Sequence, residues 1–354
     1  MVSNSEYIAR SNIEDYKTLV SNVLNAAFRR DAYQRLEECQ KLCLTPGETE
    51  LESKIYELID DITTSYALRN EIPLYADVVD ECWEEIQNRQ NGGYSGYPFK
   101  FKNLNDYVTM EKGELVVFGA GPKGGKSMML LNCAAELLKE GKSVLYLDSE
   151  LNTRMFTARL LSYLTGIEYK RIKEGRYSED EARLINEKKE WMKTRKFVHI
   201  YIPLFSLESV YAAAKKVDHM FEGLDVLVVD YFKSSEDGDA FAIYNELGRF
   251  VDMVKNKIAG DMGIAAIGAA QTTKTGNLAD SAKIARNAST ICLLQDKTPE
   301  EIERDGPECG NKKLKVVFNR NGMQTSYDEY LDLQFDGNYI RWDEAKQHIP
   351  ETPY

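Results

Sequence analysis

The segment that most constrains how this chain folds is a glycine-rich turn running from Ala120 to Ser127. It follows the apolar run of residues 115–118 and precedes the helix-like run of residues 128–131. A strand, a glycine-rich turn ending in Gly-Lys-Ser and a helix, in that order, are typical of a phosphate-binding loop. Successive backbone N–H groups and the start of the helix then point at one anion. The turn therefore predicts binding of a nucleoside triphosphate.

Two side chains of this loop have expected roles of their own. Lys126 is expected to reach the β- and γ-phosphates, and the Ser127 hydroxyl to ligate Mg²⁺. The common pattern begins with Gly, whereas this chain has Ala120 there. The alternative, a plain turn with a solvated Lys126, is disfavoured because Gly-Lys-Ser falls at the switch from strand to helix. The residues expected to contact the nucleotide are Ala120, Gly121, Pro122, Lys123, Gly124, Gly125, Lys126 and Ser127.

Composition limits the class of protein. The chain has 354 residues, of which 29% are charged and 43% hydrophobic, as in ordinary globular proteins. A net charge of −12 argues against a broad basic surface for nucleic acid or acidic membrane, but leaves room for nucleic acid held by a few loops. Cys39 and Cys43 lack a partner pair at zinc-site spacing and are expected to be core thiols. With no visible signal peptide or membrane-length apolar run, we expect a cytoplasmic protein.

The pattern of apolar residues predicts three regions. Residues 1–70 are expected to form a small all-helical region, broken at Thr45-Pro46-Gly47. Residues 71–98 are expected to hold an amphipathic helix begun by Pro73 and then a flexible linker. The apolar stripe of that helix fits burial in its own domain and burial against a neighbouring subunit equally well. Residues 99–354 are expected to form the main domain.

In the main domain, apolar runs alternate with helical stretches. This alternation predicts an α/β fold with a mainly parallel twisted sheet flanked by helices. Closely spaced runs between residues 290 and 342 predict an antiparallel extension at one edge. Ser178 and Glu181 predict a capping box at the start of a helix. The expected strands are residues 115–118, 144–147, 198–202, 226–229, 264–269, 290–294 and 314–318.

Carboxylates end two of these strands. We expect the strand ending in Asp230 to lie beside the phosphate-loop strand, so that Asp230 holds the Mg²⁺ shell. Glu150 follows the run 144–147, and a carboxylate at that edge of the sheet can orient and deprotonate an attacking water. We favour Glu150 over Asp148 as this base. The alternative is that these carboxylates only cap the turns that follow them.

Three further features lie downstream. Gln271 ends a buried run of small residues and is expected to touch the γ-phosphate and to move when it is lost. The polar loop after it suits contacts to a DNA backbone, and an ordinary solvated loop fits the same residues equally well. Arg320 is expected to reach the γ-phosphate of a neighbouring subunit as an arginine finger, although any hairpin arginine looks the same in sequence. The expected DNA contacts are Lys274, Lys283 and Arg286.

Together, these motifs resemble the RecA-like ATPase domain of the bacterial replicative helicase DnaB and its phage relatives. The resemblance covers about residues 100–342 and includes Ala and Pro at the first and third loop positions. Phe318 departs from the family, which has Lys there. More loosely, the helices before residue 87 resemble the family's linker helix, which docks on the adjacent subunit. The matching segments are residues 120–127, 145–151, 156–162, 172–175, 228–231, 270–271, 278–288 and 319–322.

The resemblance implies a short, phage-type replicative DNA helicase with a RecA-like P-loop NTPase core. Such a protein is a hexameric ring that uses ATP, or another nucleoside triphosphate, with Mg²⁺ to move along single-stranded DNA in a bacterial or phage-infected cell. Primase, a helicase loader and a single-strand binding protein are candidate partners. Two other interpretations remain: a RecA-type recombinase that forms filaments, and a nucleotide-gated loader or accessory protein without unwinding activity.

Overall fold

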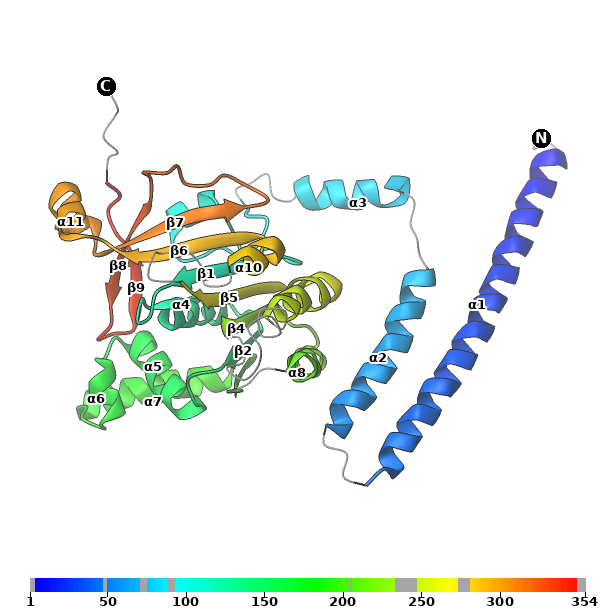
Figure 1. Cartoon of the computed structure of the whole chain (residues 1–354), viewed down its shortest axis with the longest axis horizontal. Coiled ribbons are helices and arrows are strands. Elements are labelled where there is room, and N and C mark those ends of the chain that lie inside the picture. Colours follow the sequence, from blue (N-terminus) through cyan, green and yellow to red (C-terminus); the bar gives the residue numbers. More distant parts are fainter. Residues whose placement is uncertain are drawn as a thin grey trace. The chain divides into compact units, whose positions relative to one another are not determined.

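The computed structural model describes residues 4–46, 50–70, 75–87, 93–203, 206–232, 247–272 and 281–348. Contacts divide the chain into two compact units, Met1–Asn91 and Gly92–Tyr354 (Figure 1). The first unit contains the helices α1 (Asn4–Leu44), α2 (Leu51–Asn70) and α3 (Tyr75–Gln87). Over the ranges just given, no helix combines the length and the apolar character needed to span a membrane.

In the first unit, α1 and α2 pack together, and Arg35 pairs with Asp61 across them at 3.0 Å. Thr45 and Pro46 are outside both helices, as the sequence predicts. Cys39 is buried, but Cys43 is exposed, so the expectation that Cys43 is a core thiol is wrong. Its position is on the helix face turned to solvent. Pro73, the expected start of the third helix, lies outside the described residues.

The second unit is built on a nine-stranded sheet. Its strand order is β3-β2-β4-β5-β1-β6-β7-β8-β9. The pairings from β3 to β6 are parallel, and those from β6 to β9 are antiparallel. The α/β class and the antiparallel edge are confirmed, although β6 itself pairs parallel to β1. The strands are β1 (Leu115–Ala120), β2 (Val144–Asp148), β3 (Phe197–Tyr201), β4 (Val226–Phe232), β5 (Ala265–Gln271), β6 (Thr290–Asp296), β7 (Lys312–Asn319), β8 (Leu331–Asp336) and β9 (Arg341–Glu344).

Helices cover both faces of this sheet, which explains why its central strands are apolar without alternation. Alternate side chains of β1 enter two different cores: Val116 and Phe118 pack with α4 and α5, and Leu115 and Val117 pack with α8 and the π-helix. The helices are α4 (Lys126–Lys139), α5 (Thr153–Thr165), α6 (Tyr169–Lys173), α7 (Glu179–Lys193), α8 (Leu207–Phe221), α10 (Ser281–Asn287) and α11 (Pro299–Asp305), with short helices η1 (Lys102–Asp106) and η3 (Pro307–Cys309) and the π-helix η2 (Met253–Gly260).

The strand order corrects one expectation. β4, which ends near Asp230, does not lie beside the phosphate-loop strand β1, because β5 is inserted between them. β5 consists largely of Ala and Gly. A side chain at Gly268 would overlap the ring of Phe232 on β4, so the small residues let the two strands pack closely.

The predicted capping box at the start of α7 is confirmed. The Ser178 hydroxyl accepts the N–H of Glu181, and the Glu181 carboxylate accepts the N–H of Ser178. Arg171 adds a two-point ion pair to the same carboxylate, with contacts of 2.7 and 2.5 Å. The start of α7 is therefore held by local polar contacts.

Candidate active site

The glycine-rich turn joins β1 to α4 as a compact loop. Gly124 donates its N–H to the carbonyl of Gly121 at 2.9 Å, and a Cβ at Gly124 would lie 2.9 Å from that same oxygen. Gly125 has φ +89°, a left-handed conformation that disfavours any other residue. Lys126 begins α4, is only 9% exposed, and places its ammonium 4.3 Å from the centre of the Tyr231 ring. The loop therefore presents backbone N–H groups and one cation at the start of a helix.

Asp230 lies next to the end of this loop despite the intervening strand. The Ser127 hydroxyl donates to Asp230 Oδ1 at 3.0 Å, and the Tyr146 hydroxyl donates to Oδ2 at 2.9 Å. Burial, together with the nearby Asp148 carboxylate, raises the pKa of Asp230 to about 7, against the opposing effect of those two hydrogen bonds. A buried carboxylate beside a hydroxyl is an oxygen donor set that fits Mg²⁺.

The two carboxylates after β2 have different surroundings. Asp148 is fully buried, and its Oδ1 accepts the N–H groups of Glu150 and Leu151 at 2.8 and 2.7 Å. Its Oδ2 lies 3.5 Å from His199 Nε2. Glu150, in contrast, is exposed at the carboxyl edge of the sheet. Asp148 is therefore committed to holding the turn, which leaves Glu150 as the carboxylate that solvent can reach.

Gln271 lies at the same edge of the sheet as the loop. In the pairing of β1 with β5 it stands opposite Ala120, and the N–H of Thr272 donates to the Ala120 carbonyl at 3.0 Å. The ends of β1, β2, β4 and β5 thus gather Lys126, Glu150, Asp230 and Gln271 at one edge, as expected where parallel strands meet a ligand.

Arg320 and Arg286 lie at the opposite edge. Register pairs Val116 with Thr290 and Thr290 with Asn319, so the turn after β7 is level with the start of β1. Arg320 is exposed, and its guanidinium donates to the Arg286 carbonyl at 3.2 Å. Four strand residues separate the two edges, about 13 Å. Within one chain, the structure does not bring either arginine to the loop.

The remaining DNA-contact predictions are not accessible to comparison. Lys274 lies outside the described residues, and for Lys283 only the backbone is described. Arg286, on α10, is exposed.

Two residues at the site were missed by sequence reasoning. Tyr146 contacts Asp230, and it could have been found, because it precedes Asp148 by two positions in a strand and shares its face. Trp342 donates its indole N–H to the carbonyl of Gly125 at 3.2 Å. It comes from the far end of the chain, and no local pattern signals that contact.

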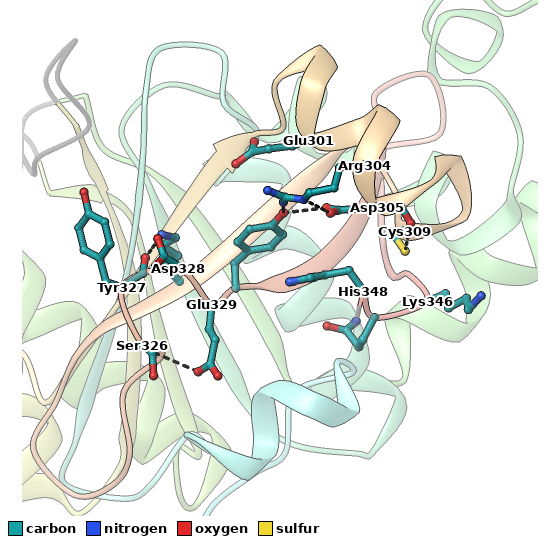
Figure 2. Close-up of a pocket in the computed structure, with 13 residues that line it drawn as sticks. Glu301, Arg304, Asp305, Cys309, Ser326, Tyr327, Asp328, Glu329, Lys346 and His348 are labelled. Atoms are coloured by element: carbon teal, nitrogen blue, oxygen red, sulfur yellow. Dashed lines mark hydrogen bonds and ion pairs between the residues drawn. The ribbon is translucent and has the colours of Figure 1, made fainter. Parts of the chain in front are cut away.

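A separate cavity of about 1020 Å³ lies at the β7–β9 edge, between α11 and the segment after β9 (Figure 2). Ligand atoms of Asp305, Asp332 and His348 lie within 4.8 Å of one another beside it, a spacing compatible with a metal ion. However, the ammonium of the buried Lys297 lies 2.8 Å from Asp305 and also pairs with Asp332. Lys297 supplies the positive charge here, so the cluster is structural.

The fold and this site define a RecA-like P-loop NTPase. The sheet order, the loop between β1 and α4, and a carboxylate two strands away at the same edge are its distinguishing features. Residues 96–344 match the family described as DnaB-like helicase C terminal domain, and the chain belongs to that family. A DnaB-like ATPase domain implies nucleotide binding.

The curated relatives are distant in sequence. Replicative DNA helicase DnaB of Helicobacter pylori (strain ATCC 700392 / 26695) is 24% identical over 64% of this chain and 47% of its own length. A DnaB of H. pylori strain J99 is 20% identical over 97% of this chain and 82% of its own. A probable plasmid replicative DNA helicase of Chlamydia trachomatis is 22% identical over 70% and 55%. The chain thus spans about half the length of two of these three relatives.

Solved structures show the same fold. One, described as a helicase-family "ATPase Domain", has a TM-score of 0.68 at 15% identity and covers 78% of this chain and 100% of that one. A second, "The Structure Of A DnaB-Like Replicative Helicase And Its Interactions With Primase", has a TM-score of 0.70 at 15% identity and covers 92% and 77%.

Proposed function

We propose that this protein is an ATP-dependent replicative DNA helicase. It hydrolyses ATP, moves along single-stranded DNA as a hexameric ring, and unwinds the duplex. The observation that carries the proposal is the gathering of the loop, Asp230, Glu150 and Gln271 at one sheet edge in a member of the DnaB-like family. The proposed regions are residues 1–70, 71–98 and 99–354, and the proposed location is the cytoplasm of a bacterial or phage-infected cell.

Nucleotide binding is assigned to the loop. The N–H groups of residues 120–127 and the ammonium of Lys126 bind the phosphates. Ser127 and Asp230 would hold Mg²⁺, which when bound neutralises negative charge on the phosphates. The 3.0 Å contact between these two side chains supports this pairing of ligands.

Hydrolysis is assigned to residues around the γ-phosphate. Glu150 orients a water molecule and takes its proton, so that the water attacks the γ-phosphorus and ADP leaves. Gln271 contacts the γ-phosphate and passes its loss on to the loop that follows β5. Arg320 of one subunit stabilises the transition state in the next, which its distance from the loop of its own chain supports.

DNA contacts are assigned to the loop and helix that follow Gln271. Lys274, Lys283 and Arg286 supply cations for the DNA backbone, so a few side chains act where the overall charge of −12 is unfavourable. We also propose primase, a helicase loader and a single-strand binding protein as partners; a DnaB-like relative of known structure is described with primase.

Glu150→Gln tests the proposal because it removes the base while keeping the shape. We expect ATP turnover, measured with and without single-stranded DNA, to fall at least about 100-fold, since a general base contributes on the order of 10²–10⁴. Nucleotide affinity is expected to stay within about threefold. Glu187→Gln, on the exposed face of α7, is the matched control. Undiminished turnover in Glu150→Gln would remove Glu150 from its role.

Unwinding needs its own measurement. We expect the wild-type protein to displace a strand from a forked DNA substrate in the presence of ATP, and to form closed rings in electron micrographs. ATP hydrolysis on DNA without displacement would favour the accessory-protein interpretation, and open filaments would favour the recombinase.

A further inference from the structure

The strand nearest the end of the described chain packs against the helix that follows the phosphate loop. Asn132, fully buried in α4, donates to the Ile340 carbonyl at 2.8 Å and accepts the N–H of Trp342 at 3.0 Å. One side-chain amide thus bonds to β9 on both sides of Arg341. These bonds set the position of β9 along α4, and with it the position of Trp342.

Trp342 contacts the loop itself. Its side chain is fully buried, and its indole N–H donates to the Gly125 carbonyl at 3.2 Å. A Cβ at Gly125 would lie 2.6 Å from the indole ring, so the ring lies directly against the loop backbone. The same carbonyl accepts the N–H of Met129 at 2.9 Å, the first hydrogen bond of α4. Two donors, one from the helix and one from β9, therefore hold this carbonyl.

Holding the carbonyl also aims the amide on its other side. The C=O of Gly125 and the N–H of Lys126 belong to one planar trans peptide, in which they point in opposite directions. A carbonyl that accepts hydrogen bonds polarises its peptide and makes the attached N–H a stronger donor. The N–H of Lys126 is one of those assigned to the phosphates, so the indole acts on the nucleotide site from behind.

We propose that Trp342 is a positioning residue for nucleotide binding. Its indole N–H fixes the peptide between Gly125 and Lys126 so that the N–H of Lys126 faces the phosphates. The inference rests on the proposed nucleotide-binding function of the loop. It extends the site to a residue 217 positions from Gly125 in the sequence.

A packing role alone would also explain a buried tryptophan, so the test must separate the two. Trp342→Phe keeps an aromatic ring but removes the N–H. Phe335→Leu is the matched control, because the Phe335 ring packs on Trp342 at 4.6 Å between centroids and the change leaves the indole N–H in place. Asn132→Ala is a second variant, which keeps the indole but frees β9 from α4.

The measurement is the dissociation constant for ADP with Mg²⁺, by calorimetry, beside thermal unfolding of each protein. We expect Kd to rise about 3- to 10-fold in Trp342→Phe, the loss of one neutral hydrogen bond, and about 2- to 5-fold in Asn132→Ala. Phe335→Leu is expected to melt at a lower temperature yet bind ADP as the wild type does.

Wild-type affinity in both Trp342→Phe and Asn132→Ala would overturn the inference, and so would an equal loss of affinity in Phe335→Leu. A wild-type protein that binds no ADP is a different result: it would refute the proposed function first and this inference with it.

Discussion

Lys126 shows how a single residue is prepared for its ligand. Its ammonium rests on the face of Tyr231, at 4.3 Å, while its side chain is almost entirely removed from water. A cation over an aromatic ring is weakly held, whereas a phosphate oxygen gives a charge-assisted hydrogen bond. Moving the ammonium from the ring to a phosphate is therefore favourable, and the chain is not required to break a salt bridge to make that contact.

Replacing Lys126 should accordingly remove the activity. We expect Lys126→Ala to lower ATP turnover at least about 100-fold, because both binding and stabilisation of charge in the transition state are lost. Lys189→Ala, half-exposed on α7, should leave turnover unchanged. Steady-state ATP hydrolysis measures both. Comparable turnover in the two variants would contradict the assignment of the loop.

At the scale of elements, the buried cluster of Lys297, Asp305 and Asp332 ties β6, α11 and β8 together. All three side chains are at most 1% exposed. We expect Lys297→Met to lower the free energy of unfolding by about 3–5 kcal/mol, because it leaves two buried carboxylates without their cation. Urea unfolding measures this. Lys346→Met, which breaks an exposed pair with Glu308, should cost about 1 kcal/mol or less.

The same cluster sets a dependence on pH. Burial alone would raise the pKa of Asp305, but hydrogen bonds from Lys297, Tyr330 and Arg304 hold it well below its usual value. A carboxyl group whose pKa is lower in the folded state stabilises the protein above its unfolded pKa of about 3.9, and this stability is lost as the pH falls below it. The loss should shrink in Lys297→Met. Equal acid sensitivity in both proteins would contradict this role of the cluster.

The elements also show what sequence patterns can and cannot predict. The loop from Ala120 to Ser127 and the capping box at Ser178 were predictable, because their hydrogen bonds join residues a few positions apart. The insertion of β5 between β4 and β1 was not, because strand order depends on contacts between distant segments. The same holds for Trp342, whose partner Gly125 lies 217 positions away.

On the scale of the whole molecule, the sheet has two functional edges. Lys126 and Glu150 lie at the carboxyl ends of the parallel strands, and Arg320 lies at the opposite end of β7. A catalytic arginine that cannot reach the loop of its own chain requires a second copy in head-to-tail contact. Such contacts close into rings when the rotation between copies permits. The geometry thus makes hydrolysis a property of the interface, as the proposed ring requires.

Mixing two inactive variants tests this directly. Arg320→Ala alone should lose about 10³-fold in turnover, and Glu150→Gln is inactive for the reason already given. When dissociated subunits of the two are mixed in equal amounts and assembled, about a quarter of the interfaces pair an intact Glu150 with an intact Arg320, so turnover should recover to a sizeable fraction of wild type. A mixture of Glu150→Gln with Lys126→Ala is the control: both lesions lie on the same side of the interface, so no interface is restored. If the first mixture is no more active than the second, Arg320 does not act across the interface, and the head-to-tail ring loses its structural support.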